Sequence, residues 1–173
     1  MSKRTAAIDG DMIIYKAGFA SEVETRWSDA IWTLHSSEDQ MKLIVDDMME
    51  YILDTVEADD YCVVFSDSKN FRYELFSEYK ANRKNKRKPL GLQAITDWMF
   101  ENYNGKRWKN LEADDVIGML CCKQDNMVAV SGDKDFGTLP CEWFNFLKQR
   151  LATQQKKKPT IITFLKLYQA IVL

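Results

Sequence analysis

Residues 111–136 have the sequence LEADDVIGMLCCKQDNMVAVSGDKDF, in which two groups of carboxylates flank an expected helix and an expected strand. The apolar spacing predicts the helix over Ala113–Gln124 and the strand over Met127–Ser131. The five acids of these groups are Glu112, Asp114, Asp115, Asp133 and Asp135. Carboxylate oxygens are hard ligands that suit Mg²⁺ or Mn²⁺, and converging acids repel each other unless a cation neutralises them. The stretch therefore predicts a divalent metal site.

Each group of acids also has a simpler interpretation. Acids are common in the first turn of a helix, where free N–H groups and the helix dipole favour negative charge, so the acids at 112–115 fit helix capping. The GDKD sequence at 132–135 fits an ordinary turn. Neither group decides between these roles alone, and the acids that follow other predicted strands favour the metal site.

Composition indicates one folded α/β domain with a buried core, because the chain has 173 residues, of which 46% are hydrophobic and 29% charged. No apolar run approaches the ~20 residues of a membrane span. The N-terminal sequence MSKRTAAIDGD lacks the apolar segment of a signal peptide. We therefore expect a cytoplasmic protein.

Cysteine and histidine contents narrow the possible chemistry. The four cysteines, at positions 62, 121, 122 and 141, show neither a CxxC motif nor zinc-ligand spacing, so we expect reduced thiols in the core. His35 is the only histidine, which argues against a histidine-built metal site and against a Ser-His-Asp triad. His35 itself is expected on the surface or in a hairpin.

Two further acids follow predicted strands. Thr5–Ile8 is expected to form a buried strand that ends in Asp9-Gly10-Asp11 and leads into a helix, and Tyr61–Ser66 forms another strand that ends at Asp67. Open α/β sheets bind ligands at the carboxyl ends of their strands. The DGD sequence alone also fits a tight turn, since Asp-Gly is a frequent turn dipeptide.

The remaining patterns complete the expected fold. Weak alternation suggests a hairpin over 21–36, and Ser37 with Gln40 fits a capping box that opens a helix reaching Val56. A helix is expected over Leu90–Tyr103 and a short strand over Arg107–Lys109. This alternation of strands and helices predicts an α/β fold with a mainly parallel central sheet and helices on both faces.

A basic aromatic segment, FRYELFSEYKANRKNKRKPLG, follows Asp67. The bases that cluster within nine of its positions are Lys80, Arg83, Lys84, Lys86, Arg87 and Lys88. A charge run is usually a solvated surface. Aromatic rings beside lysine and arginine are also what a single-stranded nucleic-acid channel requires. The net charge of −2 does not exclude such a channel, because acids and bases are segregated along the chain.

Four motifs together resemble the metal-dependent 5′→3′ nucleases, a PIN-like family that includes flap endonucleases and the 5′-nuclease domain of bacterial DNA polymerases. The motifs are DGD at 9–11, FSDSKNFRYELFSEYKANR at 65–83, LEADDVIG at 111–118 and SGDKDF at 131–136. They are most similar to the phage exonuclease branch. Each is weak alone, but four in order are specific.

The resemblance implies hydrolysis of DNA phosphodiesters from a 5′ end or at a flap, in phage replication or recombination, with two Mg²⁺ or Mn²⁺ ions. The residues it implies as metal ligands are Asp9, Asp67, Glu112, Asp114, Asp115, Asp133 and Asp135, with Asp11 as an accessory acid. It implies that Lys80 and Arg83 are catalytic and steady the phosphate, and that Tyr79 stacks on the terminal base. The implied DNA-binding residues are Tyr79, Lys80, Arg83, Lys84, Lys86, Arg87 and Lys88.

The sequence departs from the family pattern after Asp135. Family members carry a further GDxxDxxxG-type segment for the second metal and a helical module that grips DNA, whereas Glu142 is the only acid that remains here. We expect a catalytic core over 1–149 and an atypical tail over 150–173. A shortened gene, a second polypeptide that supplies the missing half, and action with one metal all fit this departure.

Two other functions fit part of the pattern. A haloacid-dehalogenase-type phosphatase would use Asp9 as a covalent nucleophile, but this interpretation leaves LEADDVIG and YKANR unexplained. A catalytically incomplete fragment that binds DNA without cutting it would explain the loss of later acids. An RNA-cleaving relative remains a further alternative.

Overall fold

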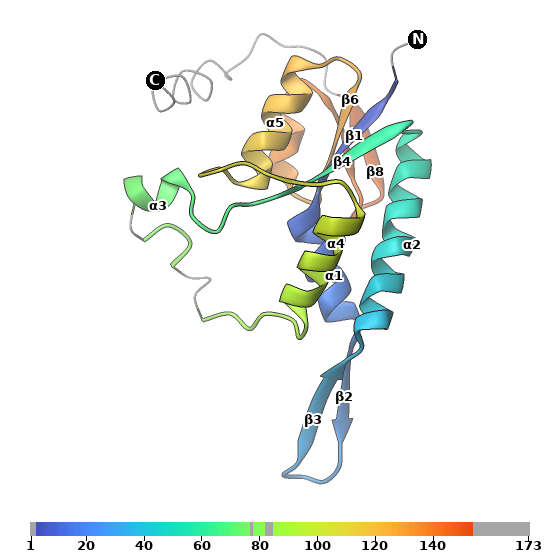
Figure 1. The fold of residues 1–173 in the computed structure, drawn as a ribbon, viewed down its shortest axis with the longest axis vertical. Helices are drawn as coiled ribbons and strands as arrows, with labels where there is room; N and C mark the ends of the chain where they lie inside the picture. The colour runs from blue at the N-terminus through green and yellow to red at the C-terminus, as the bar shows by residue number, and fades with distance from the viewer. Residues whose placement is uncertain (1–2, 77, 82–84, 154–173) are drawn as a thin grey trace.

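The computed structural model describes residues 3–76, 78–81 and 85–153, and its centre is a six-stranded sheet (Figure 1). The strand order is β5-β4-β1-β6-β7-β8. All neighbouring strands run parallel except β7 and β8, which are antiparallel. The bounds of the strands are β1 Thr5–Asp9, β4 Asp60–Phe65, β5 Gly105–Arg107, β6 Met127–Val130, β7 Glu142–Asn145 and β8 Arg150–Thr153. The predicted mainly parallel sheet is confirmed.

Helices cover both faces of this sheet, as predicted (Figure 1). One face packs against α1 (Gly10–Ala20), α2 (Glu38–Val56) and α4 (Leu92–Asn102). The other face packs against α5 (Ala113–Lys123). Among the described residues, no helix is both long and apolar enough to cross a bilayer.

The central strand β1 has side chains buried on both faces. Ala6 and Ile8 lie in the core beneath α1 and α2, whereas Ala7 lies in the core beneath α5. This alternation is the two-residue period of a strand, and a strand covered on both faces is apolar throughout. Polar side chains of β1 can therefore be placed only at its ends.

Chain connectivity places the ends of β1 and β6 at a topological switch point. From β1 the chain adds β4 and β5 on one side, and it then crosses to add β6, β7 and β8 on the other side. In open parallel sheets, ligands bind outside the carboxyl ends of the strands where the order reverses. Asp9 closes β1 at this edge.

Several predicted elements are confirmed with small shifts. Ser37 caps α2 by accepting a hydrogen bond from the Gln40 backbone N–H, and the predicted hairpin is formed by β2 (Glu22–Arg26) and β3 (Trp32–Ser36). The exposed His35 lies in this hairpin. All four cysteines are free thiols.

The short strand expected over Arg107–Lys109 begins earlier, at Gly105. The chain reverses at Asn104, whose φ is 48°, and passes so close to Phe100 that a Cβ on Gly105 would lie 2.6 Å from the Phe100 carbonyl oxygen. Because the strand starts directly after this reversal, the prediction placed β5 too late. β8, which begins at Arg150, pairs with β7 in the same sheet and was not predicted.

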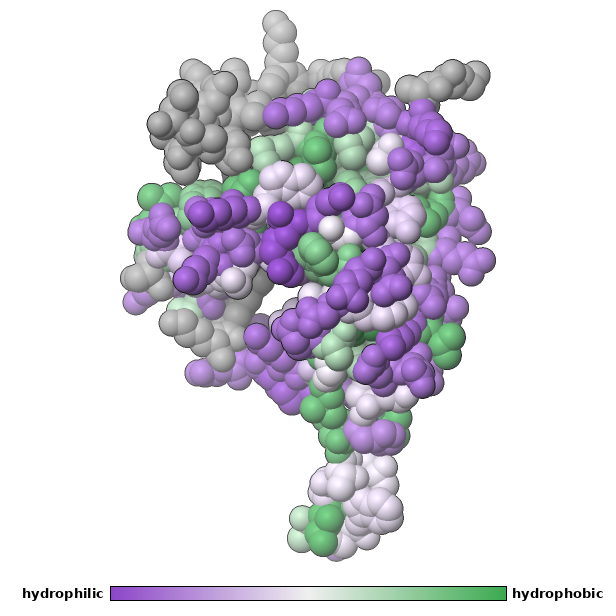
Figure 2. Space-filling view, viewed as in Figure 1, coloured by the Kyte–Doolittle hydropathy of each residue, from purple (hydrophilic) through white to green (hydrophobic). Residues whose placement is uncertain are grey.

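The β2–β3 hairpin projects from the body of the molecule as a separate arm (Figure 1). A space-filling view shows pale and green surface at the end of this arm (Figure 2). Exposed apolar residues of the hairpin and its turn are Val23, Trp27, Ile31, Trp32 and Leu34. The arm is held to the body at its base, where Ser21 Oγ and Ser36 Oγ are hydrogen-bonded at 2.6 Å.

Gly10, the first residue of α1, predicts a packing-dependent loss of stability. A Cβ at Gly10 would lie 2.7 Å from both the Phe65 ring and Val63 Cγ1. Gly10→Ala should therefore cost about 1–3 kcal/mol through overpacking and lower the melting temperature by several degrees. Thermal unfolding followed by circular dichroism measures this change.

The matched control is Gly118→Ala, in the middle of α5. Its new Cβ would meet only Leu139 Cδ1, at 3.4 Å. Because alanine favours a helix by up to about 1 kcal/mol over glycine, this variant should be at least as stable as the parent chain. Equal stability of the two variants would contradict the proposed close packing at Gly10.

Candidate functional site

A cavity of about 380 Å³ opens at the carboxyl edge of the sheet. Its wall combines the end of β1, the turn after β6, the first turn of α5 and the basic aromatic segment. Six of its ten lining residues are acids, namely Asp9, Asp11, Glu112, Asp114, Asp133 and Asp135. The other four are Met12, Ser66, Tyr79 and Lys80. The fold thus brings most of the predicted acids to one place.

Asp9 is buried at the centre of this group, with 2% of its surface exposed. Its carboxylate accepts hydrogen bonds from Ser131 Oγ at 2.9 Å and from the Met12 backbone N–H at 3.2 Å, so that it also caps α1. Burial, followed by the charges of Asp114 and Asp11, raises the pKa of Asp9 to about 7. The capping role and the site role therefore coexist in one residue.

Asp114 lies in the first turn of α5 and shares this electrostatic environment. Burial, followed by the charges of Glu112 and Asp133, raises the pKa of Asp114 to about 6. Raised carboxyl pKa values of this origin mean that burial and neighbouring negative charges disfavour the ionised forms. A bound cation would relieve this repulsion.

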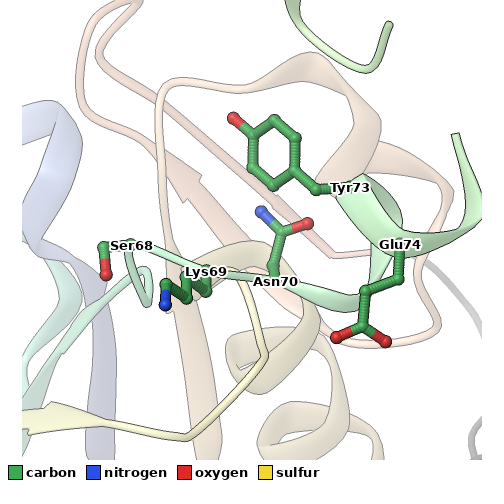
Figure 3. A pocket seen from close by; sticks show the side chains of 5 residues that line it. All are labelled: Ser68, Lys69, Asn70, Tyr73 and Glu74. Atoms are coloured by element: carbon green, nitrogen blue, oxygen red, sulfur yellow. The ribbon is translucent and has the colours of Figure 1, made fainter. Parts of the chain in front are cut away.

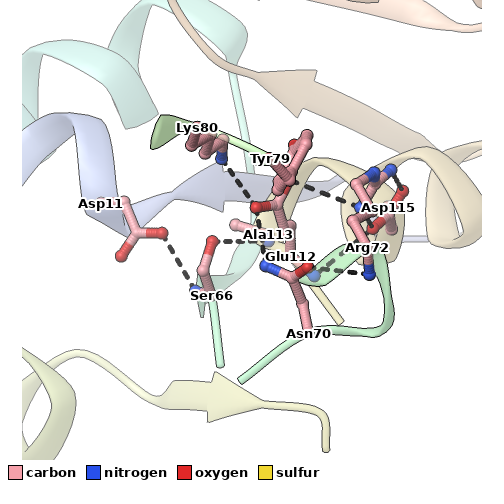
Figure 4. Close-up of polar contacts among 9 residues, drawn as sticks. All are labelled: Asp11, Ser66, Asn70, Arg72, Tyr79, Lys80, Glu112, Ala113 and Asp115. Carbon is pink, nitrogen blue, oxygen red and sulfur yellow. Dashed lines mark hydrogen bonds and ion pairs between the residues drawn. The ribbon is translucent and has the colours of Figure 1, made fainter. Parts of the chain in front are cut away.

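Ser66 and Asp11 join β4 to its neighbours at the same edge (Figure 4). The Ser66 backbone N–H donates to Asp11 Oδ2 at 3.0 Å, and Ser66 Oγ accepts from the Ala113 backbone N–H at 3.0 Å. These two contacts fix the start of α5 relative to α1. They thereby set the distance between the acids of the two helices.

Glu112 is the junction between the acids and the basic aromatic segment (Figure 4). Lys80 Nζ donates to Glu112 Oε1 at 2.7 Å, Tyr79 Oη donates to Oε2 at 2.8 Å, and Asn70 Nδ2 donates to Oε1 at 2.9 Å. Burial, followed by the hydrogen bond to Glu112, raises the pKa of Tyr79. The predicted residues Tyr79 and Lys80 thus lie at the acids.

Asp133 and Asp135 come from the turn that follows β6 and enters the 3₁₀ helix η2 (Lys134–Thr138). Asp133 Oδ1 accepts from the Asp135 backbone N–H at 3.0 Å and so caps η2. A Cβ on Gly132 would lie 2.3 Å from Leu147 Cδ1. The Leu147 and Met12 side chains would both have to move to accommodate a larger residue at position 132.

Asp67 and Asp115 make other contacts and are outside the cavity lining. Asp67 Oδ2 accepts from the Asn110 backbone N–H at 2.9 Å, and this bond is the main reason why its pKa is lowered. Asp115 is paired with Arg72 through two hydrogen bonds of 2.6 Å. These two predicted ligands are thus not among the residues that line the cavity, although Asp115 also accepts from the Glu112 backbone N–H at 3.4 Å.

The basic run is only partly described. Arg83 and Lys84, predicted to contact DNA, lie outside the described residues. Lys86 and Lys88 are exposed, and Arg87 pairs with Glu22 at the base of the hairpin through hydrogen bonds of 2.6 and 2.7 Å. Of the predicted basic residues, the described contacts bring Lys80 to the acids.

Asn70 and Arg72 contact the acidic residues but were not predicted. Both precede the basic run, so a search for clustered charge overlooks them. A signal was nevertheless present, since an arginine between two aromatic residues at positions 71 and 73 differs from the solvated lysines that follow. A second cavity, of about 370 Å³, lies on this segment and is lined by Ser68, Lys69, Asn70, Tyr73 and Glu74 (Figure 3).

The donors of the acidic cavity suit a hard divalent cation, because they are carboxylate oxygens that repel each other around the buried Asp9 and Glu112. Within residues 3–76, 78–81 and 85–153, no three Asp, Glu, Cys or His side chains converge closely enough to form a ligand set. Glu112 is instead held by Lys80, Tyr79 and Asn70. A cation bound to Glu112 would compete with these donors.

Sequence comparison connects this site to known proteins. The family described as 5′-3′ exonuclease, N-terminal resolvase-like domain, matches residues 4–165. The exodeoxyribonuclease of Enterobacteria phage T3 and the exonuclease of Escherichia phage T7 are each 30% identical over 167 residues. These alignments cover 90% of this chain and 55% and 56% of the relatives, so the chain spans about half of their length.

A relative that matches a shorter part of the chain and a solved structure give similar results. Flap endonuclease Xni of Shewanella baltica is 35% identical over 103 residues, which are 52% of this chain and 39% of that protein. The crystal structure of the bacteriophage T5 D15 protein with metal ions superposes with a TM-score of 0.55 at 19% identity, covering 86% of this chain and 56% of that one. That structure supports the predicted fold.

Buried Asp9 predicts an unusual pH dependence of stability. Its pKa is about 7 in the folded chain, above the 3.8 of an unperturbed aspartate. The protonated form therefore favours folding, and this contribution is lost as the pH rises from about 4 through about 7. Asp9→Asn keeps an acceptor for the α1 cap and abolishes the charge, so it should raise the melting temperature at about pH 8 in EDTA and change it little at about pH 4.

The same melting temperatures are also measured with Mg²⁺ present. Because a cation bound by the folded chain stabilises it, Mg²⁺ should raise the melting temperature of the parent more than that of Asp9→Asn. Asp47→Asn, on the exposed surface of α2, is the matched control and should show neither effect. A pH-independent difference between Asp9→Asn and the parent would contradict the assigned electrostatics.

Proposed function

Because this chain belongs to the 5′-3′ exonuclease family, we propose that it hydrolyses DNA phosphodiester bonds from a 5′ end or at a flap, with divalent cations. The observation that carries the proposal is the cavity where six acids meet Lys80 and Tyr79. Burial and mutual repulsion raise the pKa values of Asp9 and Asp114, and a bound cation would offset that repulsion.

The proposed cation ligands are the acids that face the cavity, namely Asp9, Glu112, Asp114, Asp133 and Asp135. Their hard oxygen donors favour Mg²⁺ or Mn²⁺, and the family pattern favours two ions. Such ions supply an activated water and stabilise the charge on a phosphate undergoing displacement. Asp11 is an accessory acid in this proposal, because its Oδ2 is already engaged by the Ser66 backbone N–H.

Lys80 is proposed to bind the scissile phosphate. Its ammonium group lines the cavity and lies 2.7 Å from Glu112 Oε1. A cationic donor there would neutralise a phosphate oxygen and stabilise the charge that develops on it. Arg83, which follows in the same segment, is proposed to assist.

Tyr79 is proposed to support the terminal base. Its ring lies 5.5 Å from the Tyr73 ring in an edge-on arrangement, and Lys80 Nζ lies 5.2 Å from the Tyr79 ring centroid. Rings beside cations bind single-stranded nucleic acid because bases stack on the rings and phosphates pair with the cations. The segment therefore suits a frayed or single-stranded 5′ end.

DNA is the proposed substrate and partner. The T3 relative is named an exodeoxyribonuclease, and a T5 D15 complex with DNA and metal ions is among the similar structures. The T3, T7 and Shewanella relatives are all named as nucleases, and they give no support to the phosphatase alternative. Supply of further site residues by a second polypeptide stays a proposal.

Release of labelled 5′ nucleotides from linear double-stranded DNA in Mg²⁺ measures the proposed activity. Asp114→Asn should lower the rate at least about 100-fold, because it removes a charge that holds the cation. Lys80→Ala should lower it about 100–1,000-fold through loss of a donor to the phosphate. Asp47→Asn should retain the parent rate.

Comparing binding with cleavage, and DNA with RNA, distinguishes a DNA nuclease from a DNA-binding fragment and from a ribonuclease. DNA binding by the parent without cleavage in Mg²⁺ or Mn²⁺ would overturn the proposal and identify a DNA-binding fragment. Faster cleavage of a matched RNA substrate would identify a ribonuclease instead. Loss of activity in Asp47→Asn would show that the loss of rate is not specific to the acids of the cavity.

A further inference from the structure

Arg72 connects the basic aromatic segment to the first turn of α5, although it does not line the acidic cavity. It lies in α3 (Phe71–Leu75), and its Nη1 and Nη2 each donate to an oxygen of Asp115 at 2.6 Å (Figure 4). Nη1 also lies 3.4 Å from Glu112 Oε2. Two parallel hydrogen bonds fix the orientation of both groups, which a single ion pair cannot do.

The guanidinium of Arg72 is also held by aromatic rings. Its Cζ lies 4.7 Å from the centroid of the Phe71 ring and 5.8 Å from that of the Tyr79 ring. Side-chain exposure is 21% for Arg72 and 8% for Asp115. Because the pair is largely removed from water, loss of one partner leaves the other charge in a poorly hydrated place without a counter-ion, which is costly.

Hydrogen bonds of Asn70 and Phe71 hold the start of α3 beside the residues that precede α5. Asn70 Oδ1 accepts from the Arg72 backbone N–H at 3.1 Å, while Asn70 Nδ2 donates to Glu112 Oε1 at 2.9 Å. The Phe71 backbone N–H donates to the Asn110 carbonyl oxygen at 3.1 Å. The start of α3 is thus attached to the residues that precede α5.

We propose that Arg72 is a positioning residue whose two-point pairing with Asp115 holds the segment that carries Tyr79 and Lys80 over the acidic cavity. The inference rests on the proposed function for its catalytic consequence. Asp115 then serves as the anchor of the substrate-binding segment, and the cavity acids hold the cation. Arg72 affects cleavage through Tyr79 and Lys80, since misplacement of reacting groups by about 1 Å can cost about 100-fold in rate.

A double-mutant cycle tests the pairing. Arg72→Gln and Asp115→Asn should each lower kcat about 10–100-fold. The kcat of the double variant should be no lower than that of the less active single variant. Arg72→Lys should recover only part of the loss, because lysine keeps the charge but lacks the two-point geometry. Arg26→Gln is the matched control, since Arg26 also pairs with an aspartate, Asp29, but on the exposed hairpin.

Two further readouts do not depend on cleavage. Binding of Mn²⁺, followed by the electron paramagnetic resonance of the free ion, should stay within about twofold of the parent in both single variants, because neither residue holds the cation. Hydrogen exchange of the backbone amides of Phe71–Phe76 should accelerate in Arg72→Gln, while that of β1 and β6 is unchanged. If the parent fails to cleave DNA, the proposed function fails, whereas these two readouts still decide the positioning role.

Additive rate losses would overturn the inference, as would unchanged exchange of Phe71–Phe76 in Arg72→Gln. Weaker Mn²⁺ binding in Asp115→Asn but not in Arg72→Gln would also overturn it, by showing that Asp115 is a cation ligand. If Arg72→Gln lowers the melting temperature of the whole chain, the same comparisons are made with Arg72→Lys, which keeps the buried charge paired.

Discussion

Repulsion among carboxylates at one edge of the sheet is the constraint on which the site depends. The parallel sheet places the ends of β1 and β6 side by side, and α5 starts next to them, so Asp9, Asp114 and Asp133 cannot avoid each other. Hydrogen bonds from Ser131 and from the Met12 backbone offset part of the cost at Asp9. The repulsion that these hydrogen bonds do not offset favours the binding of positive charge. Lys80 supplies part of that charge.

Patterns within single segments were sufficient to predict most of the fold. Buried strands such as Thr5–Asp9 are apolar throughout, and acids that follow them mark the edge at which parallel strands end. The sequence could not show which way each carboxylate points. Asp114 and Asp115 are neighbours in α5, yet successive residues of a helix lie about 100° apart, so one faces the cavity and the other faces Arg72.

What sequence patterns missed are contacts between segments that are distant along the chain. The pair of Arg72 and Asp115 joins residues 43 positions apart, and neither residue alone indicates the other. The early start of β5 has a similar cause, because the close approach of Gly105 to Phe100 is a packing event and leaves no periodic signal. Resemblance to a family recovered the motif around Arg72, but the partner of Arg72 became visible only in the folded chain.

Net charge concealed the electrostatics that matter for an anionic substrate. Several bases of the segment are already paired, Arg72 with Asp115 and Arg87 with Glu22, so they add less attraction than their number implies. The cavity has six acids against the single cation Lys80 among its lining residues. A phosphate that approached this cavity would meet net negative charge and be repelled by it. Positive charge must therefore accompany or precede the phosphate, and Glu112, which lines the cavity and accepts a hydrogen bond from Lys80, is where the acids and the basic segment meet.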